Sequence, residues 1–82
     1  MIDDKQRAYL ISSLEIIDEI RDRLILIDDR FAKLRISLFR GDMSRSGIDK
    51  VNKGYRMAGE MIEIVNRLDA EIVRALAWEE EE

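Results

Sequence analysis

The stretch LISSLEIIDEIRDRLILIDDRFAKLRISL, residues 10–38, carries apolar residues in two columns with a period of seven. One column contains Leu10, Ile17, Leu24, Phe31 and Leu38, and the other, three positions later, contains Ser13, Ile20, Ile27 and Leu34. Such a heptad seam is typical of a long amphipathic helix that packs against other helices. The chain contains no Pro to interrupt it, so we predict a helix over about residues 3–40.

A second heptad pattern predicts another helix over about residues 47–78. Its columns contain Ile48, Tyr55, Ile62 and Leu76, and Val51, Ala58, Val65 and Ile72. Asp69 interrupts the first column, and we expect its carboxylate at the rim of the seam. Apolar residues also flank the first helix's columns, at Ile11, Leu14, Ile25 and Ala32. A face this wide indicates more than one neighbouring helix.

Residues 41–46 carry turn signals between these helices. Gly41 is suited to the position just past a helix end, because glycine adopts a left-handed backbone without steric cost. Ser46 and Asp49 fit a capping box at the start of the second helix. Residues 79–82 form an acidic tail. The fold class predicted is therefore all-α, a single domain over residues 1–82 folded as a long antiparallel helical hairpin.

Small and polar residues beside the second seam suggest how it packs. Gly54 and Ala58 lie on the apolar stripe, where small side chains let another helix approach closely. Asn52, Gly59 and Asn66 form a neighbouring column with a period of seven. Asn beside a seam either fixes the register of the helices or lies on a solvated rim, and the sequence leaves both interpretations open.

An 82-residue chain with no Cys and no His lacks the disulfides and imidazole or thiolate metal sites that stabilise small domains. Oligomerisation is the remaining source of stability, and we predict a homodimer in which two hairpins form a four-helix bundle. The expected interface contains Leu10, Ile17, Ile20, Leu24, Ile27, Phe31, Leu34, Tyr55, Ala58, Ile62, Val65, Leu68 and Ile72.

The expected location is the cytoplasm, with no membrane partner. The chain has no Cys, and Asp3 and Asp4 stand where a secretory leader would be positive. Its longest apolar run, Leu24–Ile27, is far shorter than the roughly 18 residues that a membrane span needs.

Charge is segregated along the chain. Residues 30–56 contain eight basic and two acidic residues, a net charge of +6, whereas residues 1–29 carry −4 and residues 57–82 carry −6. The turn end of the hairpin is therefore positive. The candidate anion-binding or partner-binding residues are Arg40, Arg45, Lys50, Lys53 and Arg56. The simplest partner is the second subunit, and the alternatives are an acidic protein or nucleic-acid phosphates.

Two enzyme resemblances rest on short patterns. Glu15, Asp18, Glu19 and Asp22, together with Glu60 and Glu63, resemble the acidic pairs of the all-helical nucleoside triphosphate pyrophosphohydrolases, which would imply a Mg²⁺ site. Lys33, Asp42 and Arg45 are similar in spacing to the Lys, Asp and Arg of the small dimeric helical chorismate mutases. Asp22 and Ser46 depart from that family, which has Arg and Glu there.

No Cys or His nucleophile or base and no glycine-rich phosphate loop is present. We therefore assign no catalytic, cofactor-binding or metal-binding residue and expect no cofactor. The expected function is a non-enzymatic homodimeric interaction or scaffolding module. The first alternative is nucleic-acid association through the basic turn, and the second is a small helical enzyme of one of the two types above.

Overall fold

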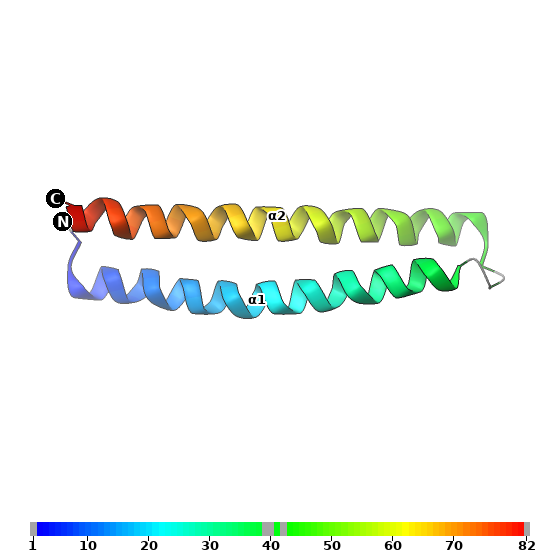
Figure 1. The fold of residues 1–82 in the computed structure, drawn as a ribbon, viewed down its shortest axis with the longest axis horizontal. Coiled ribbons are helices and arrows are strands. Elements are labelled where there is room, and N and C mark those ends of the chain that lie inside the picture. The colour runs from blue at the N-terminus through cyan, green and yellow to red at the C-terminus, as the bar shows by residue number, and fades with distance from the viewer. Residues whose placement is uncertain (1, 39–40, 42, 82) are drawn as a thin grey trace.

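Two long helices lie side by side and antiparallel in the computed structural model, which describes residues 2–38, 41 and 43–81, with side chains as far as residue 78 (Figure 1). α1 spans Asp4–Ser37 and α2 spans Arg45–Glu81. They form a rod of 60 × 15 × 14 Å with no strand in its described part. We call the end where α1 begins and α2 ends the open end, and the opposite end the turn end. The prediction of an all-α helical hairpin is confirmed.

α1 begins at a capping box. The Asp3 carboxylate accepts a hydrogen bond from the Gln6 N–H at 2.7 Å, and the Gln6 side-chain oxygen accepts one from the Asp3 N–H at 3.1 Å. These bonds satisfy backbone donors that a helix start otherwise leaves unpaired. Asp3 is therefore the cap, and the helix starts one residue later than predicted.

The turn differs from the prediction at both of its helix ends. α1 ends at Ser37, with Leu38 as its C-cap in a right-handed conformation, and the predicted end at Arg40 lies outside the described residues. Gly41 has no positive φ, so the expected left-handed glycine was wrong. Ser44, and not Ser46, caps α2, because its hydroxyl accepts a hydrogen bond from the Gly47 N–H at 3.2 Å.

α2 is longer than predicted. The Ser44 cap lets the helix begin at Arg45, so Ser46 and Gly47 lie inside it. Its backbone also runs past residue 78, through glutamates of the predicted acidic tail, to Glu81. Glutamate is a good helix former, and no Gly or Pro follows Trp78 to end the helix.

The seam between the helices contains the few side chains that one hairpin buries. Ile17, Leu24 and Ala58 are at most 5% exposed, and they are the buried hydrophobic residues of the described chain. Gly54 lies against the Phe31 ring of α1, since a Cβ at this position would stand 2.6 Å from Phe31 Cε1. Close packing at Gly54 is thus confirmed. A Cβ on Gly59 would meet no atom within 4 Å.

Candidate functional site

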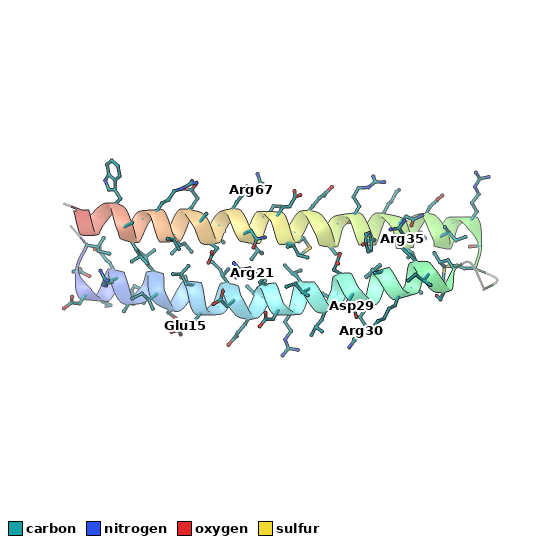
Figure 2. All side chains as sticks on the ribbon, in the orientation of Figure 1. Glu15, Arg21, Asp29, Arg30, Arg35 and Arg67 are labelled. Atoms are coloured by element: carbon teal, nitrogen blue, oxygen red, sulfur yellow. The ribbon has the colours of Figure 1, made fainter. Side chains whose placement is uncertain are left out.

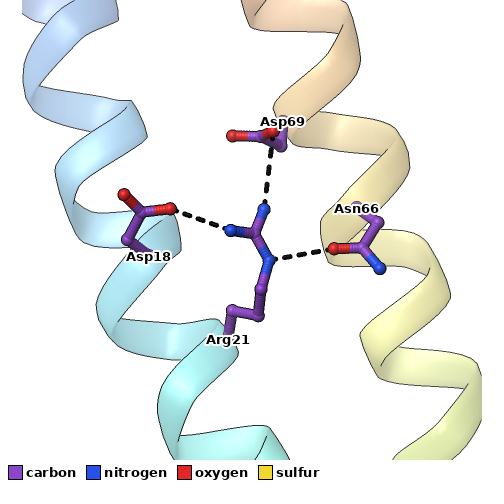
Figure 3. A network of polar contacts seen from close by, with 4 residues as sticks. All are labelled: Asp18, Arg21, Asn66 and Asp69. Carbon is purple, nitrogen blue, oxygen red and sulfur yellow. Dashed lines mark hydrogen bonds and ion pairs between the residues drawn. The ribbon is translucent and has the colours of Figure 1, made fainter.

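Arg21 lies near the middle of the rod (Figure 2) and joins the two helices on one long side of the hairpin (Figure 3). Its Nε donates to Asn66 Oδ1 at 2.9 Å and its Nη1 to Asp18 Oδ1 at 2.9 Å, while Nη2 lies 3.5 Å from Asp69 Oδ2. The Asp69 side chain is 33% exposed, in agreement with the expected rim position. The planar guanidinium thus holds one residue of α1 and two of α2 together.

Arg35 makes a second bridge on the same side, nearer the turn end (Figure 2). Its Nε donates to Asn52 Oδ1 at 3.0 Å, and its Cζ lies 4.7 Å from the centroid of the Tyr55 ring. A shallow groove of about 520 Å³ beside it is lined mainly by apolar groups, from Ala32, Arg35, Ile36, Leu38, Ile48, Asn52 and Tyr55. Both asparagines therefore receive arginine donors from the opposite helix, which supports the register interpretation.

These bridges identify one long side of the rod as its polar face, defined by Asp18, Arg21, Arg35, Asn52, Asn66 and Asp69. At about 100° per residue, Arg21 lies about 60° to one side of Leu24 around α1, while Ile20 and Ile27 lie about 40–60° to the other side. On α2, Asn66 lies about 80° to one side of Ala58, and Met61 and Leu68 lie about 60–80° to the other. Because Arg21 contacts Asn66, the opposite flanks of both helices share the other side of the hairpin.

That other side is an exposed apolar face. Its large side chains include Ile16, Ile20, Ile27, Met61, Ile64 and Leu68, which are between 44% and 55% exposed. The two columns at its centre, residues 13, 20, 27 and 34 on α1 and residues 54, 61, 68 and 75 on α2, contain no charged residue. Exposed apolar side chains along one side of a small protein form a candidate interaction surface.

The residues predicted for the dimer interface separate into three groups. Ile17, Leu24 and Ala58 are buried by the other helix of the same chain. Seven others are half-buried along the seam, at Leu10, Phe31, Leu34, Tyr55, Ile62, Val65 and Ile72. Ile20, Ile27 and Leu68 remain exposed on the apolar face. The predicted interface does not include Ile16, Met61 and Ile64, although Met61 lies on the apolar stripe of the second helix, seven residues before Leu68.

The basic residues near the turn end are exposed. Arg45, Lys50, Lys53 and Arg56 have no ion pair with any acid in the described part of the chain. Around α2, Arg45, Lys53 and Arg56 lie on the side that points away from α1, whereas Lys50, about five turns before Leu68, lies on the same flank as Leu68. The four cations therefore do not converge on one pocket. Arg40, predicted to belong with them, lies outside the described residues.

No family model, curated protein or solved structure matches this chain. Among the described residues, neither helix has a segment long and apolar enough to cross a membrane.

The carboxylates that suggested a Mg²⁺ site do not gather. Within the described residues, no group of three or more acids is placed to hold a metal ion. Asp18 pairs instead with Arg21 at 2.9 Å, and Glu15 points away from α2 (Figure 2). Glu60 and Glu63 are exposed, and at about 100° per residue they lie nearly opposite Ala58 around α2, so they point away from α1 and its acids.

The pattern shared with the chorismate mutases does not form a site in the described residues either. Lys33 pairs with Asp29 at 2.9 Å on the surface of α1. Asp42 lies outside the described residues. Arg45 is the exposed first residue of α2. α2 continues unbroken from Arg45 to Glu81.

Proposed function

We propose that this chain is a non-enzymatic interaction module that associates with a second copy of itself, the two hairpins packing through their apolar faces as a four-helix bundle. The observation that carries the proposal is the apolar face, where Ile20, Ile27, Met61 and Leu68 are between 44% and 51% exposed. A second hairpin has a face of the same length and pattern, so it covers these side chains along the whole rod.

The small core of one hairpin supports the same proposal. Only Ile17, Leu24 and Ala58 are buried hydrophobic residues in the described chain, which is a small core for a domain that is itself small. Burying the exposed half of an Ile, Leu or Met contributes on the order of 1 kcal/mol. A second copy supplies that contribution at each position of the apolar face in both chains.

The test compares two isoleucines of similar exposure on opposite sides of α1. Ile20 is 44% exposed on the apolar face, and Ile25 is 50% exposed on the other side of Leu24. Ile20→Ser should weaken the dimer by about 2 kcal/mol, roughly 30-fold in Kd, because both copies lose a contact. Ile25→Ser, which makes the same chemical change, should leave Kd unchanged. Sedimentation equilibrium measures both constants.

Two results would contradict self-association. One is a folded wild-type monomer at micromolar concentration, with its helicity measured by circular dichroism in the same sample. The other is equal weakening of the dimer by Ile20→Ser and Ile25→Ser, because association would then not depend on the apolar face.

A second candidate function is nucleic-acid association through the turn end. The observation in its favour is that Arg45, Lys50, Lys53 and Arg56 are exposed and form no ion pair with acids in the described chain. Phosphate binding through these groups would be salt-sensitive and would be lost when Arg45, Lys50 and Lys53 become Glu. Fluorescence anisotropy with duplex and single-stranded oligonucleotides at low salt tests it, and an unchanged signal eliminates it.

A further inference from the structure

The apolar face admits two symmetric ways of pairing hairpins. A twofold axis along the rod places the two turn ends together and stacks α1 on α2 of the second copy. A twofold axis across the rod places each turn end against the other copy's open end, stacking α1 on α1 and α2 on α2. Both axes give a closed dimer in which the same surface is used twice.

The apolar side chains fit both arrangements. The bridges Arg21–Asn66 and Arg35–Asn52 fix the register of the hairpin, since the residue numbers in each pair add to 87. With the axis along the rod, Ile20 therefore lies level with Leu68 of the second copy. With the axis across its middle, Ile20 lies level with Ile27 of the second copy. Large apolar residues meet either way, so packing alone leaves the axis undecided.

Charge decides between the two axes. The turn end, residues 30–56, carries +6, and the segments that lead to the open end carry −4 and −6. An axis along the rod brings two segments of +6 together, with the exposed Lys50 and Lys53 among them. An axis across the rod brings each positive end against a negative one. Charges on adjacent helices commonly set their orientation in this way.

We propose that the twofold axis of the dimer crosses the rod at its middle, near Arg23 and Ile64, so that α1 pairs antiparallel with α1 of the second copy and α2 with α2. This inference rests on the proposed self-association and adds its geometry. Arg23 is exposed at the rim of the apolar face, and because it is near the axis it lies opposite Arg23 of the second copy. The repulsion between these two exposed charges is small compared with the repulsion between two segments of +6 that the other axis would bring together.

Two serines provide the labelling sites for a direct test. The chain has no Cys, so Ser46→Cys places a single spin label at the turn end, and Ser12→Cys places one toward the open end. Both serines are exposed, and the substitutions are nearly isosteric, so the hairpin is retained. Double electron–electron resonance then measures distances between the two copies.

With the axis across the rod, two Ser46→Cys labels should lie on the order of 50 Å apart, because each is about 18 residues from the axis at 1.5 Å per residue. A dimer mixed from Ser46→Cys and Ser12→Cys copies should give a distance below roughly 35 Å. With the axis along the rod, the Ser46→Cys dimer gives the short distance and the mixed dimer gives the long one. That outcome overturns the proposed axis while leaving self-association intact. A monomer, with no distance between copies and the sedimentation of one chain, overturns the proposed function and this geometry with it.

Discussion

Gly54 shows how a single residue makes room for a side chain of the opposite helix. A Cβ at this position would stand 2.6 Å from Phe31 Cε1 and 3.0 Å from Phe31 Cζ, distances at which the ring or the helix must move. The gain in helix propensity from Gly to Ala is about 1 kcal/mol, and overpacking costs about 1–3 kcal/mol. We therefore expect Gly54→Ala to reduce the free energy of unfolding by about 1 kcal/mol.

Gly59→Ala is the matched control for this change, five residues further along the same helix. Since a Cβ there meets no atom within 4 Å, the same substitution should stabilise the chain by up to about 1 kcal/mol. Urea denaturation at one fixed protein concentration measures both variants. Equal effects at the two glycines would contradict the close approach of Phe31.

Arg21 should matter more than the other arginines that form surface ion pairs. It contacts Asp18, Asn66 and Asp69 and is only 26% exposed, whereas Arg74 pairs with Glu71 alone and is 73% exposed. We expect Arg21→Ala to cost about 1–2 kcal/mol of unfolding free energy, because hydrogen bonds across the hairpin are lost and Asp69 is left unpaired. Arg74→Ala should cost less than about 0.5 kcal/mol. If urea denaturation gave the two variants equal stability, the Arg21 bridge would not stabilise the hairpin.

At the scale of the helix, the start of α2 gives a clear test of the cap. Ser44 accepts the Gly47 N–H, whereas Ser46 is exposed inside the helix. Ser44→Ala should cost about 1 kcal/mol because a backbone donor loses its partner. Ser46→Ala should be neutral or slightly stabilising, since Ala is the better helix former. Thermal unfolding followed by circular dichroism distinguishes them, and the reverse order would restore the cap expected from the sequence.

The helices themselves were predictable because their apolar residues repeat every seven positions. Ile17 and Leu24 stand in the column that the period indicates, and both are buried. The cap was not predictable, because Ser44 and Ser46 are equally good capping residues and stand two positions apart. The apolar face was only partly predictable. Columns through Ile20 and through Ile25 flank the seam alike, and the bridge from Arg21 to Asn66, which spans 45 positions, decides which of them belongs to the apolar face.

At the scale of the whole molecule, the proposed dimer, in which each turn end faces the other copy's open end, should dissociate more readily as salt is added. Raising NaCl from 0.05 to 0.5 M shortens the Debye length from roughly 14 Å to about 4 Å and screens the attraction between the turn end and the open end. We therefore expect the dimer Kd to rise about fivefold, as measured by sedimentation equilibrium. The variant Lys50→Gln/Lys53→Gln, which removes two exposed cations of the turn end, should bind more weakly at low salt and respond less to the change. A Kd that falls as salt is added would indicate like ends together, because screening relieves repulsion in that arrangement. The sign of the salt effect therefore tests the axis independently of any label.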